Sequence, residues 1–241
     1  MSEDTHDTGP AAGRTGRGGR NHPGPPLWLL AIISLLLFLA GILTSVGLTG
    51  STPPSPFDSA STMQHYLDHE HATVALELVA FFLFGSSIPL GLYSATVHSR
   101  LHYLGIRAAG ATIALYGGLG ASAMLALSGL CEWVLSRSDV RADLPVARAL
   151  QDLGFAFGGP GFTVLLGLLL AGIAVTTLIT RLLPRGLAWA GLVIAVIGEL
   201  SHFSLLWESM TPLIPVGRFA GLAWLIAAGV LLPRARPRRN A

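Results

Sequence analysis

The chain has no lysine, a single cysteine and few charged residues of either sign. Charged side chains make up 12% of its 241 residues, against about 25% in soluble domains. Cys131 alone excludes an intramolecular disulfide and a cysteine-based metal cluster. The net charge of +2 is small and seven of the fifteen arginines lie in the two terminal segments, so the chain gives no reason to expect nucleic-acid binding.

No signature of a common catalytic or nucleotide-binding site occurs in the sequence. The nucleophile elbow GxSxG, the phosphate-binding P-loop and the zinc motif HExxH are all missing. These absences remove any direct reason to expect an enzyme. They favour a non-enzymatic protein that needs no cofactor.

Apolar residues, in contrast, are abundant and gathered in long runs. They make up 51% of the chain, and the mean hydropathy is +0.61. The runs lack the alternation of barrel strands, and each can cross about 30 Å of hydrocarbon as a helix. We therefore predict an all-α fold, a polytopic membrane helical bundle of six transmembrane helices within residues 27–233. The predicted spans are Leu27–Leu48, Thr73–Val97, Leu104–Leu130, Leu153–Thr180, Leu187–Trp207 and Val216–Leu232.

The two ends of the chain differ in composition from this apolar part. Residues 1–26 are rich in Gly, Pro, Arg and Thr and poor in bulky apolar groups, so we predict a disordered cytoplasmic tail there. Residues 234–241 form a short basic tail, also expected in the cytoplasm. The length of the first apolar run favours an uncleaved anchor over a cleaved signal peptide.

The distribution of arginine predicts the orientation. With the N-terminus inside, eleven arginines fall in inner segments and four in outer ones. Because cytoplasmic segments carry the excess of basic residues, both termini are expected to be cytoplasmic, in a multi-pass protein of the cell membrane. The inner arginines are Arg14, Arg17, Arg20, Arg100, Arg107, Arg181, Arg185, Arg234, Arg236, Arg238 and Arg239, and the outer ones are Arg137, Arg141, Arg148 and Arg218.

The most unusual residues of the apolar runs are Glu199 and His202, one helical turn apart in the fifth run. A charge near the bilayer centre costs about 2.5–3.5 kcal/mol, so such residues usually face the interior of the bundle. Gly191, Ala195 and Glu199 also recur at four-residue spacing, which places Glu199 on a packing face. The pair predicts a proton-exchanging site or half of a polar ligand pocket. The alternative is a neutral glutamate that bonds to a neighbouring helix and has only a structural role.

Other ionisable residues are expected at a similar outer depth. Glu77 lies near the outer end of the second span, Arg218 opens the sixth, and Glu132 and Glu208 mark the outer ends of the third and fifth. Together they predict a polar cavity open to the outside. The predicted ligand- or proton-binding residues are Glu199, His202, Glu77 and Arg218.

The first outer loop contains a possible metal site. Ser61 followed by Gln64 is a capping-box pattern, which predicts a short helix over residues 61–72 that leads into the second span. On this helix His65 and His69 are four residues apart and face one way, the spacing of metal ligands in zinc proteases. A Zn²⁺ or Cu²⁺ site is one interpretation. An exposed polar cap is the other, because no third ligand is identified.

Small residues repeat at four-residue intervals in two predicted spans. Such stripes let helix backbones approach closely. They predict packing within the bundle, with a homo-oligomer or a membrane-protein partner as the alternative, and Pro89 and Pro160 are expected to kink or break their helices. The stripes are Gly110, Ala114, Gly118, Ser122 and Ala126 in the third span and Gly217 and Gly221 in the sixth.

One stretch of the C-terminal third resembles a known group of proteins. Residues 183–192, LPRGLAWAGL, form a turn between two late helices and are followed by a last helix and a basic tail. This pattern is similar to that of bacterial, actinobacterial-type integral membrane proteins with a domain of unknown function. The resemblance implies six membrane helices and carries no catalytic residue to this chain.

These observations favour a membrane protein that binds or relays a small ligand or a proton in its outer half, as a carrier or an accessory subunit. A metal-dependent membrane enzyme or metal sensor that uses His65, His69 and His202 is one alternative. A scaffold that acts through its small-residue faces is another. The lipid bilayer is the partner that all three share.

Overall fold

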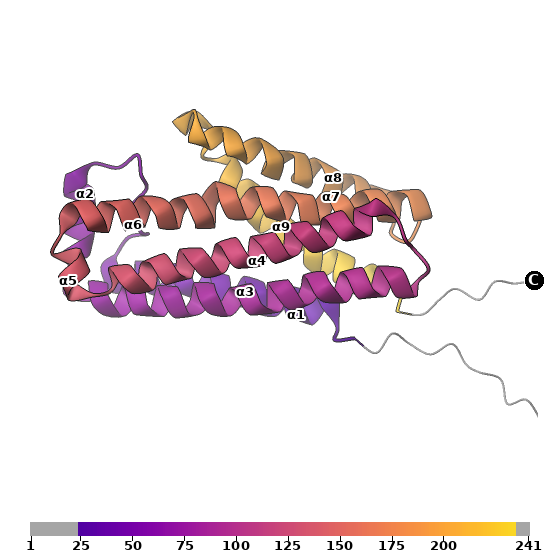
Figure 1. Ribbon diagram of the computed structural model, residues 1–241, viewed down its shortest axis with the longest axis horizontal. Helices are drawn as coiled ribbons and strands as arrows, with labels where there is room; N and C mark the ends of the chain where they lie inside the picture. Colours follow the sequence, from indigo (N-terminus) through magenta and orange to yellow (C-terminus); the bar gives the residue numbers. More distant parts are fainter. Residues whose placement is uncertain (1–23, 235–241) are drawn as a thin grey trace, which may run out of the picture.

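The computed structural model describes residues 24–234, and this part of the chain is helical without strands. Six helices or continuous helical segments are long and apolar enough to cross a membrane (Figure 1). The predicted all-α fold and number of spans are confirmed. The spans are α1 (Leu27–Thr49), α3 (Ala72–Tyr103), α4 (Ala109–Leu135), α6 to α7 (Leu144–Thr180), α8 with a 3₁₀ turn (Arg185–Leu205) and the segment of α9 (Glu208–Leu231).

The six spans form a closed ring in which chain neighbours pack side by side. α1 packs on α3, α3 on α4, α4 on α7 (Phe162–Thr180) and α7 on α8 (Arg185–Leu200). α9 (Leu213–Leu231) closes the ring against α8, α7 and α1. The described part of the chain begins and ends at one end of the bundle, and α2 (Ala60–Leu67) and α5 (Ser138–Arg141) lie at the other, called here the α2 end (Figure 1).

The surface of this ring has the character expected of a membrane protein. Large apolar side chains point away from the bundle along the spans, among them Leu43, Phe81, Ile179 and Val193, each more than half exposed. Contiguous apolar surface of this kind is rare on soluble monomers and marks contact with lipid or with another protein. The architecture is that of a multi-pass membrane protein.

The predicted boundary of the third span is wrong by several residues. Gly105 adopts a left-handed conformation with φ of 90°, and the backbone N–H of Ile106 bonds back to the carbonyl of Leu101. Glycine favours this conformation and ends helices in this way. The chain therefore turns at Leu104 to Ala108, which is apolar enough to resemble membrane helix, and α4 begins at Ala109.

The small residues of α4 pack inside the bundle. A Cβ atom on Gly172 of α7 would lie 2.5 Å from both the backbone nitrogen of Ala114 and the carbonyl oxygen of Gly110. A Cβ on Gly118 would lie 2.4 Å from the hydroxyl of Ser94 in α3. These approaches confirm the prediction of intramolecular packing, because backbones can only meet this closely where side chains are missing.

The two helix prolines have different effects. α3 runs through Pro89 without a break, whereas Pro160 lies in a π-helical turn, η1 (Phe157–Gly161), between α6 (Leu144–Ala156) and α7. Proline has no N–H with which to continue an α-helical ladder, and π turns often occur at functional sites. The predicted disruption is confirmed at Pro160.

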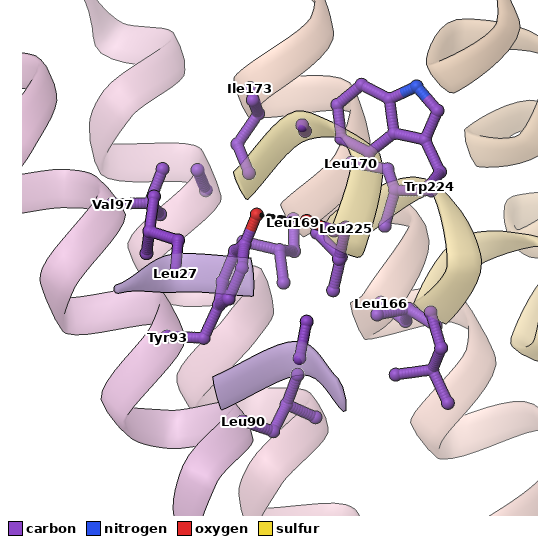
Figure 2. Close-up of a cluster of buried hydrophobic side chains, with 14 of the residues drawn as sticks. Leu27, Leu90, Tyr93, Val97, Leu166, Leu169, Leu170, Ile173, Trp224 and Leu225 are labelled. Carbon is purple, nitrogen blue, oxygen red and sulfur yellow. Dashed lines mark hydrogen bonds between the residues drawn. The ribbon is translucent and has the colours of Figure 1, made fainter. Parts of the chain in front are cut away.

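The main apolar core fills the half of the bundle near the described termini. Figure 2 shows Tyr93 of α3 among leucines of several helices, including Leu27, Leu169 and Leu225. Tyr93 is fully buried and its hydroxyl donates a 3.0 Å hydrogen bond to the carbonyl of Leu225. The core thus ties α3 to α9 across the ring, and its close packing leaves the more open space to the α2 end.

Candidate functional site

A cavity of about 280 Å³ lies in the α2 half of the bundle. Helices α1, α3, α4, α6 and α9 supply its walls, together with η1 and the loop after α1. Most of the lining is apolar, and five polar side chains reach it: Ser128, Glu132, Gln151, Thr211 and Arg218. Small-molecule sites usually combine an apolar wall with a few polar groups in this way.

Two glycines on one face of α6 and η1 line this cavity and pack against α4. Gly154 and Gly158 are one turn apart, and both line the cavity. Ser128 of α4 packs on this face and donates a 2.9 Å hydrogen bond to the carbonyl of Gly154. A Cβ on Gly158 would lie 2.5 Å from the hydroxyl of Ser128, so the missing side chains let α6 and η1 approach α4 closely beside the cavity.

Glu132 is the acidic group of the cavity. It is 5% exposed, and its Oε2 atom has no hydrogen-bond partner. Its Oε1 atom lies 3.7 Å from the position of a Cβ on Gly154, so the carboxyl group lies against the glycine face. A buried carboxyl oxygen without a partner is costly, so Glu132 is a candidate ligand-binding residue.

Arg218 of α9 is the basic group of the cavity. It contacts Gly158, one helical turn beyond Gly154, which Glu132 contacts. Its Nη2 donates to the carbonyl of Gly158, and its guanidinium lies 4.8 Å from the ring centre of Phe38 and 5.2 Å from that of Phe162. Stacking on two rings fixes the guanidinium and favours its charge. Its buried Nε has no hydrogen-bond partner.

Gln151 and Thr211 complete the polar lining. Gln151 is buried and donates a 3.0 Å hydrogen bond from Nε2 to the carbonyl of Pro54, while its Oε1 has no partner. The hydroxyl of Thr211 is buried without a partner as well. The bond to Pro54 fastens the loop after α1 to α6 and so forms one wall of the cavity.

The acidic and basic groups of the cavity do not pair with each other. The ion pairs within the described residues are His71–Glu70 and Arg137–Asp139, so the charged atoms of Glu132 and Arg218 are more than 4.0 Å apart. Four buried polar atoms without a hydrogen-bond partner belong to residues that line this one cavity, on Glu132, Gln151, Thr211 and Arg218. Buried polar atoms are nearly always bonded in folded proteins, so this group is a candidate site for a polar ligand.

The four residues predicted from the sequence do not meet in one place. Arg218 lines the cavity, whereas Glu199, His202 and Glu77 are not among its lining residues. Glu77 is exposed and lines a separate surface cleft with Trp133 and Arg141. The predicted convergence of these residues on one pocket is therefore absent from the described part of the chain.

The Glu199–His202 pair is split because the helix changes at Leu200. Glu199 packs on α7, where its Oε1 lies 3.1 Å from the position of a Cβ on Gly167, which agrees with a packing face. α8 ends at Leu200 and continues as the 3₁₀ turn η2 (Ser201–Leu205), so His202 turns outward and is exposed. Its Nδ1 lies 2.5 Å from the carbonyl oxygen of Glu199, which is a local contact within the turn.

Replacing Glu199 with glutamine is expected to leave ligand binding unchanged, because its side chain lies between α8 and α7 outside the cavity. Binding affinity of the purified variant, compared with that of wild type, is the measurement. An affinity loss of tenfold or more would return Glu199 to the binding site.

The predicted metal pair is separated by the end of its helix. α2 starts after Ser59, whose hydroxyl accepts from the N–H of Thr62, and it ends at Leu67. The predicted helix over 61–72 with a cap at Ser61 is thus wrong at both ends, and His69 lies in the turn beyond α2 rather than on one face with His65. Residues 24–234 contain no group of three or more His, Cys, Asp or Glu able to hold a metal ion. A Zn²⁺ or Cu²⁺ site stays a prediction.

Tyr66 joins the short helix α2 to the end of α1. It is 3% exposed, and its hydroxyl lies 3.1 Å from that of Ser45. Burial raises the pKa of Tyr66 to about 12, and the negative charge of Glu132 adds to the rise. The tyrosine thus stays neutral in the folded protein at pH values where an unfolded chain would already ionise.

The raised pKa of Tyr66 predicts a loss of stability at alkaline pH. Between the unfolded pKa near 10 and the folded value of about 12, the unfolded chain loses a proton that the folded one retains. This contributes about 2–3 kcal/mol of stability below pH 10 that declines as the pH rises to 12. Tyr66→Phe is expected to be less stable at neutral pH by about 1 kcal/mol, through loss of the Ser45 bond, but to decline less steeply above pH 10. The measurement is the melting temperature of both proteins as a function of pH. If the two melting temperatures fall equally steeply between pH 10 and 12, this role of Tyr66 is contradicted.

The sequence gives weaker signals for Glu132 and Gln151 than for Arg218. The position of Glu132 after Leu130 predicts that it lies at the outer end of the third span, but nothing in its local sequence shows that it is buried. The best signal is the pair Gly154 and Gly158, whose four-residue spacing marks a helix face without side chains. Gln151 precedes that face by three residues and therefore lies on it.

Comparison of the chain with protein-family models, with curated proteins and with solved structures gives no match. The resemblance to bacterial membrane proteins therefore rests on the turn at residues 183–192 and stays a prediction.

Proposed function

We propose that this chain is a multi-pass protein of the cell membrane that binds a small polar molecule in the cavity between Glu132 and Arg218, as a carrier or an accessory subunit. The observation that carries this proposal is the set of four buried, unsatisfied polar atoms around one apolar cavity. A ligand that bonds to these atoms would remove the cost of leaving each unpaired, about 1–3 kcal/mol per group.

The construction of the cavity supports binding more than packing. Membrane helices that only need to associate do so through small residues and satisfied polar contacts, as α4 and α7 do at Gly172. Beside Glu132 of the same helix, in contrast, a cavity of about 280 Å³ remains open. Ionisable residues inside membrane helices are commonly part of ligand or ion pathways.

The experiment compares ligand stabilisation of wild type with that of a variant whose cavity is filled. Gly154→Leu suits this purpose, because Gly154 lines the cavity next to the carboxyl group of Glu132 and an added Cβ would meet its neighbours only at 3.4 Å or more. Gly47→Leu is the matched control, since a Cβ there meets nothing within 4 Å.

Thermal unfolding of the purified proteins is measured with a panel of small polar molecules of about five to ten non-hydrogen atoms. At least one compound is expected to raise the melting temperature of wild type and of Gly47→Leu, but not that of Gly154→Leu, because a bound ligand stabilises the folded state. A panel without any compound that distinguishes the filled variant would contradict the proposal.

The proposed orientation, with both termini in the cytoplasm and the cavity in the outer half, is supported by the arginine excess on the inner segments. It is tested with single cysteines in a Cys131→Ser background. A membrane-impermeant thiol reagent applied to whole cells is expected to label Ser61→Cys in α2 and to leave Gly186→Cys at the opposite end unlabelled. The reverse pattern would invert the orientation.

A further inference from the structure

We propose that the ligand of this cavity is a zwitterion of the ω-amino acid type, with its ammonium group at Glu132 and Gln151 and its carboxylate at Arg218. This inference rests on the proposed function and names the chemical class that the same site would take. It follows from which polar atoms are unsatisfied, where they lie and what separates them.

One end of the cavity presents acceptors. The unsatisfied atoms there are carboxyl and amide oxygens, Oε2 of Glu132 and Oε1 of Gln151. The Gln151 amide nitrogen is already bonded to Pro54, so the oxygen is the atom left to bind. An ammonium group has three N–H donors and no acceptor. It can therefore satisfy both oxygens at once and compensate the charge of the carboxylate.

The other end presents donors. The guanidinium of Arg218 is held by the carbonyl of Gly158 and by two aromatic rings, and its Nε–H is left without an acceptor. A carboxylate accepts from this group, and bonds between a guanidinium and a carboxylate are among the stronger hydrogen bonds in proteins.

The spacing of the two ends sets the length of the ligand. Glu132 lies against Gly154 and Arg218 bonds to Gly158, which are four residues apart on one helical face. At the rise of an α-helix this separation is about 6 Å. A chain of four methylene groups places an ammonium and a carboxylate at a comparable distance. The cavity wall between them is apolar, with Leu125 and Ile214 among its residues, and suits methylene groups.

The charge balance excludes ligands with a single charge as the best fit. A simple carboxylate would leave Glu132 and Gln151 unsatisfied, and a simple amine would leave Arg218 unsatisfied. Each unpaired buried group keeps its full desolvation cost. The site and a zwitterion are each neutral overall, and their charges complement one another end to end.

The test uses a set of probes that differ in one feature at a time. 5-Aminopentanoate has both charges at the proposed spacing, pentanoate and pentylamine each lack one, and norvaline has the same composition as 5-aminopentanoate with the charges adjacent. Affinities for the purified wild-type protein are measured by isothermal titration calorimetry. 5-Aminopentanoate is expected to bind at least tenfold more tightly than each of the other three.

Variants assign the ends of the ligand. Glu132→Gln is expected to remove most of the tenfold preference for 5-aminopentanoate over pentanoate, while Arg218→Gln is expected to remove its preference over pentylamine. Glu199→Gln serves as the matched control and should retain both preferences. Each variant is first checked for the elution profile and helical circular dichroism of wild type, and Glu132→Met replaces Glu132→Gln if that variant does not fold.

The outcomes separate the two proposals. Tighter binding of pentanoate or pentylamine, lost in Gly154→Leu, would overturn the zwitterion and leave the binding cavity in place. Norvaline binding as tightly as 5-aminopentanoate would overturn the proposed spacing. If no panel compound raises the melting temperature of wild type above that of Gly154→Leu, and none of the four probes binds wild type more tightly than Gly154→Leu, the proposed function itself is contradicted.

Discussion

Replacing Glu132 with methionine is expected to stabilise the protein and to abolish binding of the ligand. The Oε2 atom of Glu132 is buried without a partner, at a cost of about 1–3 kcal/mol. Methionine has a similar length, is apolar and adapts to irregular space. We therefore expect the free energy of unfolding of the empty protein to rise by about 1–3 kcal/mol, which would raise the melting temperature by several degrees in a chain of this size.

This result would distinguish a functional carboxyl group from a structural one. Residues kept for binding often reduce stability, and replacing them commonly increases it. Glu77→Met is the control, because Glu77 is exposed outside the cavity and its replacement should change the melting temperature little. A melting temperature of Glu132→Met well below that of wild type would show that Glu132 holds the bundle together, and would remove the main support for the cavity as a binding site.

Replacing Gly172 with alanine is expected to destabilise the bundle strongly. The added Cβ would lie 2.5 Å from the nitrogen of Ala114 and from the carbonyl oxygen of Gly110, and both are backbone atoms that cannot rotate away. α4 and α7 would have to separate, which weakens one of the largest helix–helix contacts of the ring. Overpacking of this kind costs about 1–3 kcal/mol and sometimes more, and we expect the upper end of that range.

The matched control for Gly172 is Gly47→Ala in α1, where a Cβ meets nothing within 4 Å. Alanine is favoured over glycine in helices by about 1 kcal/mol, so this variant should be as stable as wild type or slightly more so. The measurement is thermal unfolding of both variants in the same detergent. Equal melting temperatures for Gly172→Ala and Gly47→Ala would contradict the close contact of α4 with α7.

Much of the fold could be predicted because membrane helices leave two strong signals in a sequence. Long apolar runs identify the six spans, and four-residue stripes such as Gly110, Ala114 and Gly118 identify the faces that pack. Errors occurred where backbone conformation, rather than hydropathy, decides the boundary. Gly105 ends α3 within an apolar stretch, and α2 stops at Leu67 although polar residues continue beyond it.

The site was predicted only in part, because depth along a helix can be estimated from the sequence but direction around the bundle cannot. Arg218 and Glu132 were placed at the right depth, and both line the cavity. Glu199 has the expected packing orientation, yet the side of α8 that carries it packs on α7 and does not line the cavity. His202 is exposed because a 3₁₀ turn follows Leu200, and the apolar sequence around it gives no sign of that turn.

The most direct test of the binding cavity is the density around Glu132 and Arg218 in an electron cryomicroscopy structure of the protein purified from its membrane. We predict that the two side chains stay more than 4.0 Å apart, as they do here, with density for a small non-protein molecule between them. A direct ion pair between Glu132 and Arg218 that closes the cavity would contradict a ligand site at this position.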